Sequence, residues 1–439
     1  MKCSSPGTAC EFGYRRIGLP HNPRHSARDT RRNTTMESIQ QASDTGSEGL
    51  ENSELIDLIH RDALRVLEEV GVRCNSERVR RIFEDTGLAA YDDGSGHLHI
   101  LTPLVEQALS TAPKRDQYWI PENSFGVGGT APFVYDDSTG ELIEPTLEHL
   151  IKIASIVDQA DVVNFMARGV LLKKQEVKVM DTIIENCRKP IYVAAVTDEG
   201  IARAKEIHNK RGKITIQFSI LNSPLALIDS MMDPFLKCVK TGLPIYVSTM
   251  PMAGLSAPYS MSGLLTLTHA EALFGITLTQ LVNPGLMTVH AGLPSIANIQ
   301  KNYAVDLGLV SHNIANLLME KVSKKLGLPS IQTACTTSQD HPNRIAEQEA
   351  VAGFALMKKY GFHQMRHAFG FLKELVSFSI AKLERHIELL RETGADQAPD
   401  YEIDSYDPEG FEVIMRNRSQ ANYMRDDHTL KNTGKAFLT

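Results

Sequence analysis

The chain has 439 residues, of which 42% are hydrophobic and 23% are charged, an ordinary composition for a globular protein. Its formal net charge of −7 gives no electrostatic reason to expect a nucleic-acid partner. No apolar run approaches the roughly 20 residues that a membrane-spanning helix needs. The six cysteines are scattered without a CxxC pair, as expected of free thiols in a reducing compartment. We therefore expect a cytoplasmic protein with no nucleic-acid and no membrane partner.

The first 50 residues are rich in Ser, Arg and Gly and show no hydrophobic periodicity, so we expect residues 1–50 to be disordered. The Arg-rich stretch from Arg15 to Arg32 is similar in composition to a transit peptide, but it lacks the apolar core of a secretory signal. Met36 is an alternative translation start. We prefer the interpretation that the residues before it are an annotation artefact.

Residues 51–120 predict a small helical extension at the N-terminus. Apolar residues recur at helical spacing from Leu55 up to Gly71, and glycine is a typical helix stop. A second helix is predicted over Ser76 to Phe83. A third follows in LTPLVEQALSTA, where Pro103 suits the first turn of a helix.

Residues 121–397 contain eight short apolar runs that each end in polar residues, and helical patterns follow most of them. The runs are FVYDD, VVNFMARG, KPIYVAAV, ITIQFSI, LPIYVSTM, LMTVHAG, PSIQTAC and FHQMRHA. Strands that alternate with helices predict a parallel sheet, and eight at this spacing predict a closed (β/α)8, or TIM, barrel of the α/β class. The active site of such a barrel lies where its strands end. Residues at or near these ends are Arg168, Gln217, Met250, His290, Thr336 and His367.

The glycine-rich segment from Gly126 to Pro132 precedes a predicted strand, which is the wrong order for a dinucleotide-binding loop. We interpret it as a turn. After the last predicted strand, FSIAKLERHIELLRE predicts an amphipathic helix that closes the barrel wall. Residues 398–439 form a polar, acidic tail that becomes helix-like again from about Gly410 to Met424.

Strand alternation predicts which side chains enter the barrel. We expect Thr215 and Gln217 to point inward, and by the same logic Thr288 and His290, with Val289 facing the helices. A lumen lined by Gln, Thr and His is more polar than a plain barrel core, which favours a polar or charged ligand. The alternative is a polar core satisfied by ordered water.

Two loops at the predicted barrel mouth are candidates for function. The segment from Ser248 to Gly263 is long and rich in Gly, Pro and Met, and Tyr259 lies within it. In the helix beyond, a partly buried Glu271 would hold a loop or balance a cationic substrate. The second loop, CTTSQDHPNRIAEQEA, carries His341 and Arg344, although a charged loop is often merely solvated. No spacing in the chain predicts a metal site.

These motifs resemble the trimethylamine methyltransferase family, corrinoid-dependent barrel enzymes that demethylate methylated amines. The resemblance covers roughly residues 53–432. Its markers are LIHRDALRVLEEVGV, GGTAPFVYDDSTGEL, PMAGLSAPYSMSGLLTLTHAEAL, LVNPGLMTVHAGLPS and DDHTLKN.

The chain departs from the family pattern in two places. The trimethylamine-specific members carry pyrrolysine at the end of the seventh strand, a region that falls near Ser338 to Arg344 here and holds only standard residues. This implies the non-pyrrolysine branch, whose members resemble methyltransferases of glycine betaine and related quaternary amines. The family also usually continues past the HTL motif, whereas this chain stops at Thr439, so we expect a truncated or diverged C-terminus.

The resemblance implies a methyltransferase that moves a methyl group from a quaternary amine similar to glycine betaine to the Co(I) corrinoid of a cognate corrinoid protein. It also implies that no corrinoid is bound permanently and that the chain forms a homo-oligomer. The chemistry agrees, because a quaternary nitrogen is already activated to leave as a neutral amine, whereas a tertiary amine must first be protonated or captured. Such an enzyme positions its substrate and needs no assigned catalytic residue or metal ligand.

Candidate substrate-binding residues follow from these expectations. Aromatic faces that bind a quaternary ammonium are Tyr259, Tyr303 and Phe369. A substrate carboxylate would bind Arg168, Arg344, His290 or His341. Gln217, Glu271 and His367 complete the predicted set.

Three alternatives remain open on the sequence. The first is transfer from trimethylamine itself, as in the methanogenesis enzymes. The second is a barrel that has lost catalysis and serves as a binding protein. The third is an unrelated barrel lyase or aldolase, but a Schiff base needs a lysine at a strand end, and Lys173 and Lys174 lie past the second strand.

Overall fold

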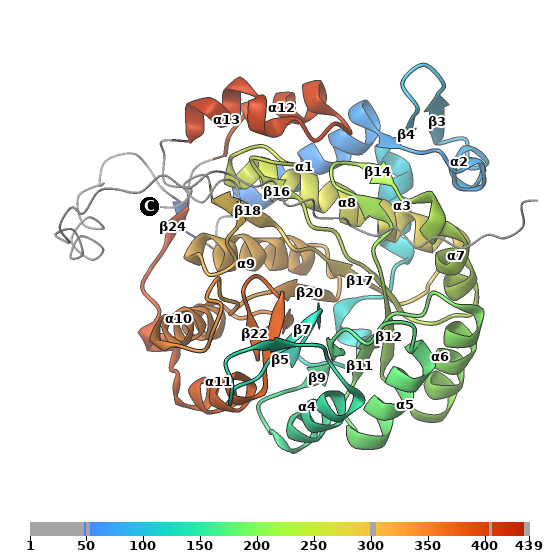
Figure 1. The fold of residues 1–439 in the computed structure, drawn as a ribbon. Helices are drawn as coiled ribbons and strands as arrows, with labels where there is room; N and C mark the ends of the chain where they lie inside the picture. Colours follow the sequence, from blue (N-terminus) through green and yellow to red (C-terminus); the bar gives the residue numbers. More distant parts are fainter. Residues whose placement is uncertain (1–47, 50–52, 299–303, 404–405, 434–439) are drawn as a thin grey trace, which may run out of the picture. The chain divides into compact units, whose positions relative to one another are not determined.

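The computed structural model describes residues 48–49, 53–298, 304–403 and 406–433. Eight parallel strands close into a barrel, in which each strand pairs with its neighbours in chain order and the last pairs with the first (Figure 1). The predicted (β/α)8 barrel is therefore confirmed. The barrel strands are β5 (Ser124–Val127), β9 (Phe165–Met166), β11 (Ile191–Val193), β12 (Ile214–Phe218), β15 (Ile245–Val247), β17 (Thr288–Ala291), β20 (Ser330–Thr333) and β21 (Gln364–Arg366).

A helix follows each barrel strand and packs on the outside of the barrel (Figure 1). The amphipathic stretch after the last strand is one of them, as the sequence predicts. The eight are α4 (Leu147–Gln159), α5 (Glu176–Asn186), α6 (Asp198–Arg211), α7 (Met232–Lys240), α8 (Met261–Val282), α9 (Val310–Lys325), α10 (Arg344–Tyr360) and α11 (Ile380–Glu392). No described helix is both long and apolar enough to cross a membrane.

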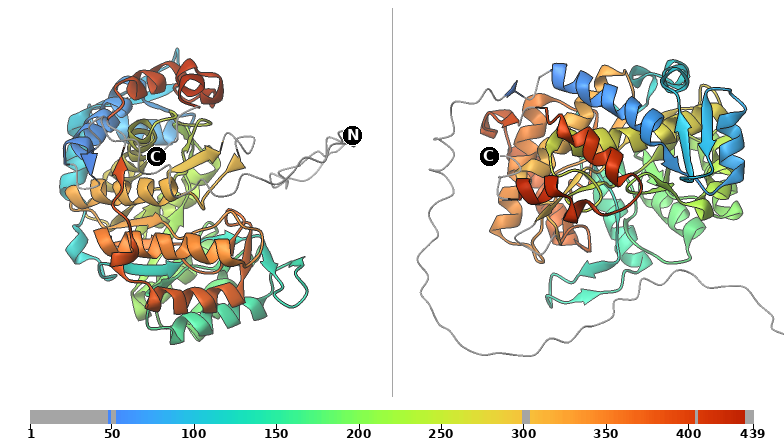
Figure 2. Two further views of the ribbon diagram at one scale, coloured as in Figure 1. Left: turned by 90° about the vertical axis from the view of Figure 1, so that its left-hand side faces the viewer. Right: turned by 90° about the horizontal axis from the view of Figure 1, so that it is seen from above.

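The first barrel strand is not the FVYDD run, so that prediction was wrong. The strand is Ser124–Val127, and Gly126 makes it possible, because a Cβ there would lie 2.3 Å from the Phe165 ring of the neighbouring strand. The FVYDD run instead forms β7 (Phe133–Tyr135), which hairpins with β8 (Leu142–Ile143). The hairpin, in teal, projects from the barrel in Figure 2. It joins a four-stranded sheet with β22 (Phe371–Leu372) and β23 (Ser377–Ser379).

Two separate apolar clusters show which side chains face the lumen. The lumen holds Tyr192, Tyr246, Val289 and Ala291 among others, whereas Ile216 belongs to the main cluster between strands and helices. The inward orientation predicted for β12 is confirmed. The prediction for β17 was wrong: Val289 and Ala291 point inward, and Thr288 and His290 face the helices. Their side chains are stable there because α8 and α9 supply polar partners. Gln280 hydrogen-bonds Thr288, and both His269 and Ser323 hydrogen-bond His290.

The N-terminal extension packs on α8 rather than on the whole barrel. The predicted helices are present as α1 (Ser53–Arg65) with the π-helical turn Val66–Val70, α2 (Glu77–Glu84) and α3 (Thr102–Thr111). Unpredicted strands β2 (Val72–Arg73), β3 (Ala89–Asp92) and β4 (His97–Ile100) form a sheet with β13 (Leu221–Asn222) and β14 (Ala226–Leu227). Because α1, α3 and α12 (Glu409–Asn417) also cover α8, residues 261–280 of α8 are all buried (Figure 1). The division of the chain at residues 50, 120 and 397, which we drew from the sequence, remains a prediction.

The remaining elements are short. Near the mouth, β6 (Thr130–Ala131) pairs with β10 (Gly169–Val170), and β16 (Met252–Ala253) with β18 (Ser295–Asn298), which also pairs with β19 (Ala304–Val305). Towards the C-terminus lie α13 (Asp427–Asn432) and the pair β1 (Glu48–Gly49) and β24 (Glu402–Ile403). The 3-10 turns are Arg115–Gln117, Asp229–Met231, Ala395–Gln397 and Tyr423–Arg425.

Candidate functional site

A network of neutral hydroxyl groups closes the amino-terminal end of the lumen. The Tyr118 hydroxyl lies 2.8 Å from the Tyr192 hydroxyl and 2.7 Å from Thr215 Oγ1. Tyr192 in turn donates to Gln364 Oε1. Burial raises the pKa of both tyrosines, so both stay protonated. A ligand of the lumen must therefore enter from the carboxyl ends of the strands, as in other barrels of this class.

Arg366 lies above this floor, at the end of β21, and only 3% of it is exposed. Its guanidinium donates to Tyr246 Oη (3.2 Å), Ser248 Oγ (2.9 Å) and Thr333 Oγ1 (3.3 Å). The guanidinium carbon also lies 5.4 Å from the centre of the Tyr246 ring. All of these partners are neutral, and no carboxylate in the described part of the chain pairs with Arg366. Its positive charge is therefore held in place but not compensated.

Arg168 follows β9 and adds a second cation to the same region. Burial lowers the pKa of its guanidinium, while the nearby Tyr246 hydroxyl and the Glu176 carboxylate raise it. Within the described ranges its side chain makes no hydrogen bond and no ion pair. A partly buried guanidinium without an acceptor is unfavourable unless an anion binds it. Arg168 and Arg366 thus form a candidate anion site beside Tyr246.

Gln217 and His367 border this candidate anion site. Gln217 pairs with Tyr246 across β12 and β15, and among the described residues its amide has no hydrogen-bond partner. His367 follows Arg366 with a φ of 64°, and its Nδ1 lies 3.1 Å from Thr333 Oγ1. Burial lowers its pKa well below the ordinary value, so its ring is neutral.

The glycine-rich segment that we interpreted as a turn makes room for His367. A Cβ on Gly128 would lie 2.7 Å from His367 Cδ2, and one on Gly129 would lie 2.8 Å from Nε2. Phe371 packs edge-on against the same ring, with 5.2 Å between ring centres. The segment begins within β5, whose last residues are Gly126 and Val127, and it also contains β6, so only Gly128 and Gly129 form the turn between the two strands. It shapes one wall of the mouth.

Glu271 holds loops and does not face the lumen directly. It is fully buried on α8 and accepts hydrogen bonds from Ser223 Oγ (2.7 Å), Leu225 N (2.8 Å) and Thr249 Oγ1. Burial raises the pKa of its carboxyl to about 7. Of the two roles expected from the sequence, the contacts match the holding of a loop.

Several predicted residues lie away from the candidate anion site. His290 is fully buried in the helix layer, between His269 Nδ1 and Ser323 Oγ, each 2.9 Å away. Tyr259 is buried in the main core against Gly254, and Phe369 against Phe354. Tyr303 lies outside the described residues.

The charged loop after β20 is mostly solvated. Arg344 is exposed at the start of α10. His341 pairs with Asp340 at 2.6 Å and is also exposed. Asn343 caps α10 by accepting from Ala346 N. The Cys335 thiol faces α10, and burial raises its pKa, which opposes a nucleophilic role.

The residues that sequence reasoning missed share a readable signal. Tyr192 and Tyr246 are the central residues of two identical PIYV sequences, and each points into the lumen. Arg366 stands two positions after the inward Gln364 in QMR, so strand alternation also places it inside. Tyr118 enters from outside the strands, and no periodicity in the sequence marks it.

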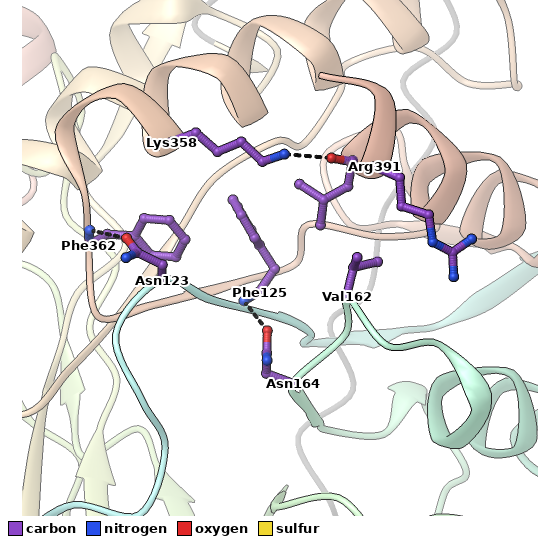
Figure 3. A pocket seen from close by; sticks show the side chains of 8 residues that line it. Asn123, Phe125, Val162, Asn164, Lys358, Phe362 and Arg391 are labelled. Atoms are coloured by element: carbon purple, nitrogen blue, oxygen red, sulfur yellow. Dashed lines mark hydrogen bonds between the residues drawn. The ribbon is translucent and has the colours of Figure 1, made fainter. Parts of the chain in front are cut away.

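A hollow of ≈ 610 Å³ lies at the opposite end of the barrel (Figure 3). Its lining residues are Asn123, Phe125, Val162, Asn164, Lys358, Phe362, Leu390 and Arg391. The polar groups there join structural elements: Lys358 Nζ donates to Leu390 O (2.7 Å), and Asn164 Oδ1 accepts from Phe125 N (3.1 Å). Because conserved chemistry in these barrels lies at the carboxyl ends, we assign this hollow a structural role.

Comparison with known proteins identifies the family. A family model described as trimethylamine methyltransferase (MTTB) matches residues 21–439. Trimethylamine methyltransferase MttB1 of Methanosarcina acetivorans is 24% identical over 369 residues, which cover 76% of this chain and 73% of the relative. The glycine betaine methyltransferase of Desulfitobacterium hafniense is 22% identical, with 87% and 84% covered. The proline betaine:corrinoid methyltransferase of Eubacterium limosum is 25% identical, with 62% of each chain covered.

The match of the family model extends over nearly the whole chain, including both arginines of the candidate anion site and the loops around it. The relatives share a reaction class, methyl transfer, but their names give different substrates. As its sequence motifs indicate, this protein belongs to the trimethylamine methyltransferase family.

Proposed function

We propose that this protein transfers a methyl group from a quaternary amine bearing a carboxylate, such as glycine betaine, to the reduced corrinoid of a partner protein. The observation that supports this substrate is the pair of guanidiniums, Arg168 and Arg366, at the top of a lumen that is closed below. Two relatives whose names specify betaines point in the same direction.

The charges of the candidate anion site favour a zwitterion over a simple amine. A substrate carboxylate accepts hydrogen bonds from Arg168 and Arg366, and such charge-assisted bonds are the strong ones. Protonated trimethylamine brings only a positive charge, which two guanidiniums in a partly desolvated site oppose. The absence of pyrrolysine from the Ser338–Arg344 region agrees with this choice.

The position of the arginines also sets the orientation of the substrate. With its carboxylate on Arg366, the quaternary nitrogen lies further toward the open carboxyl end, where an acceptor arrives. The bond between the methyl carbon and nitrogen breaks, and its electron pair stays on nitrogen as a neutral tertiary amine. The corrinoid, when its protein docks, supplies the nucleophile that takes the methyl group. The chain itself contributes orientation, which is a large part of such catalysis.

Other parts of the proposal concern the surroundings of the reaction. The corrinoid is presented by a cognate corrinoid protein and is not a resident group of this chain. We place the reaction in the cytoplasm, because the described cysteines, Cys74, Cys187, Cys238 and Cys335, are all free. We also expect the chain to act as a homo-oligomer.

The first test replaces the two arginines one at a time. Arg168→Gln and Arg366→Gln should each raise the Kd for glycine betaine by about 10- to 100-fold, the value of a charge-assisted hydrogen bond. Isothermal titration calorimetry measures the Kd. Arg188→Ala is the control, because it removes a guanidinium that is 88% exposed. Binding by both arginine variants as tight as wild type would overturn the site.

A turnover assay distinguishes quaternary amines that bear a carboxylate from trimethylamine as the substrate. Methylation of the reduced corrinoid protein is followed by absorbance with glycine betaine, proline betaine, carnitine, γ-butyrobetaine and trimethylamine. We expect turnover with at least one carboxylate-bearing quaternary amine and none with trimethylamine. Turnover with trimethylamine alone would refute the charge argument.

A further inference from the structure

Glu271 connects two loops at the mouth of the barrel through one carboxylate. Its Oε1 accepts from Leu225 N at 2.8 Å, in the loop after β12. Its Oε2 accepts from Ser223 Oγ at 2.7 Å in the same loop and from Thr249 Oγ1 in the loop after β15. All three groups point hydrogens at the carboxylate, which is fully buried. This arrangement suits an ionised acceptor with no proton of its own.

The loop that Glu271 holds also carries an anchor of the candidate anion site. Thr249 follows Ser248, whose Oγ accepts from Arg366 Nη2 at 2.9 Å. Ser248 N donates to Phe218 O (2.7 Å), and Leu293 N donates to Thr249 O (2.9 Å), so these two bonds hold the backbone of the pair, while Glu271 holds the Thr249 side chain. A change in the charge of Glu271 therefore reaches the Arg366 guanidinium through only two residues, Thr249 and Ser248.

We propose that Glu271 is a positioning residue: its ionised carboxylate fixes Thr249 and thereby Ser248 and the guanidinium of Arg366, so that the candidate anion site binds its carboxylate ligand tightly only while Glu271 is charged. This inference rests on the proposed function, to which it adds a dependence on pH. Glu271 touches neither substrate nor reacting atoms.

Protonation of Glu271 weakens all three hydrogen bonds, including the one from Leu225 N, because a neutral carboxyl is a poorer acceptor than a carboxylate. The new O–H is also a donor that needs an acceptor, and a hydroxyl such as that of Thr249 turns most easily to provide one. Burial raises the pKa of Glu271 to about 7, although the bonds from Leu225 N and Ser223 lower it. The change of charge therefore falls in the neutral range.

The groups around Glu271 do not titrate in the same range. Its charge raises the pKa of Tyr423, a buried residue of the C-terminal segment that burial already keeps protonated. His269, two residues earlier on α8, hydrogen-bonds His60 and His290 instead, and burial lowers its pKa well below neutrality.

The expected size of the effect follows from the ionised fraction. With a pKa of about 7, Glu271 is roughly nine-tenths ionised at pH 8 and roughly one-tenth ionised at pH 6. If only the ionised form holds Arg366 in place, the apparent Kd for glycine betaine rises by up to about tenfold between these pH values.

Titration calorimetry with glycine betaine at pH 6, 7 and 8 tests this on the full-length protein. Wild type should bind about tenfold more weakly at pH 6 than at pH 8. Glu271→Gln, which has no charge to lose, should bind weakly and equally at all three. Glu271→Asp keeps a carboxylate and should keep a pH step. Glu384→Gln, on the exposed side of α11, is the control and should behave as wild type. A flat profile for wild type, or the wild-type step in Glu271→Gln, would overturn the proposal.

Amide hydrogen exchange at Leu225 gives a second measurement that needs no ligand. After correction for the intrinsic rate, protection of this amide in wild type should fall by up to about tenfold from pH 8 to pH 6 and stay constant in Glu271→Gln. If wild type binds no betaine, the proposed function fails, and exchange still decides the role of Glu271. Protection of Leu225 that does not change with pH would overturn that role.

Discussion

Tyr192 and Tyr246 show how the same residue acquires different tasks from its neighbours. Both phenols are buried in the lumen, and burial raises the pKa of both, so both stay neutral. Tyr192 donates to the Gln364 amide and completes the closed floor. Tyr246 accepts from Arg366 one layer higher, where its ring also contacts the cation. The polarity of the lumen therefore rises toward its open end.

Gly126 is needed for the close packing of the first barrel strand, so its replacement should destabilise the protein. Gly126→Ala adds a Cβ that would lie 2.3 Å from the Phe165 ring, and overpacking of this kind costs about 1–3 kcal/mol of unfolding free energy. Urea unfolding measures the loss. Gly94→Ala is the control, because its new Cβ meets only the flexible Asp92 carboxylate, at 3.2 Å. Equal stability of Gly126→Ala and wild type would mean that Ser124–Val127 does not pack as the first strand.

Three histidines link elements that are far apart in the sequence. His60 Nδ1 on α1 lies 2.9 Å from His269 Nε2 on α8, and His269 Nδ1 lies 2.9 Å from His290 Nε2 on β17. His290 Nδ1 lies 2.9 Å from Ser323 Oγ, which itself donates to Met319 O. The Ser323 hydroxyl oxygen therefore accepts from His290 Nδ1–H. Each ring then carries its hydrogen on Nδ1, which donates to the next group, and the Nε2 atoms of His269 and His290 act as acceptors. An extra proton on either of these Nε2 atoms would remove the acceptor that the preceding ring needs.

Acid should therefore destabilise the protein through these rings. Burial lowers the pKa of His290 from 6.5 to about 3 and that of His269 well below 6.5. The unfolded chain takes up protons near pH 6.5 and the folded chain does not, so the contribution to stability is complete above pH 6.5 and is lost as pH falls toward about 3. At pH 5 the loss is about 2 kcal/mol for His290.

Urea unfolding at pH 7.5 and pH 5 of wild type and His290→Gln checks this expectation. The variant has one histidine fewer to protonate on unfolding, so its stability should fall by about 2 kcal/mol less between the two pH values. Buried histidines that do not contact His290 contribute equally to both proteins. His290 also lowers the pKa of His269, so its removal reduces the acid loss of the variant further. The same fall in both would contradict the assignment.

At the scale of the whole chain, the N-terminal and C-terminal segments meet on one barrel helix. Helices α1, α3 and α12 cover α8 from outside while the barrel covers it from inside. Its four threonines Thr266, Thr268, Thr277 and Thr279 are buried, and the last three satisfy their hydroxyls on carbonyls four residues earlier. Glu271 and His269 also stand on α8. The helix therefore joins the mouth loops, the histidine chain and both ends of the described chain.

The crossing of α12 over α8 depends on two glycines. A Cβ on Gly410 would lie 3.1 Å from Gly263 Cα, a backbone atom that has little freedom to move. Gly410→Val should therefore lower the unfolding free energy by about 1–3 kcal/mol and separate α12 from α8. Glu412→Val, on the exposed side of the same helix, controls for the helix propensity of valine. Thermal unfolding compares the two variants, and equal midpoints would refute this crossing.

The sequence predicts the barrel well because alternation of short apolar runs and helices is a local signal. It misplaces the first strand because Ser124–Val127 is short and contains glycine, and the reason for that glycine is Phe165, 39 residues later. It turns His290 the wrong way because the polar partners that stabilise this residue come from α8 and α9. Arg168 and Gln217 follow from strand ends alone, whereas the neutral partners of Arg366 become visible only when β15, β20 and β21 are brought together.

The closed floor of Tyr118, Tyr192 and Gln364 has a kinetic consequence under the proposed function. The lumen then has one entrance, which the amine and the demethylated product pass and which the corrinoid protein covers when it docks. The amine must bind before the corrinoid protein, and the product can leave only after that protein dissociates. Binding is therefore ordered, and an excess of the corrinoid protein should inhibit turnover because it covers the entrance of the empty enzyme.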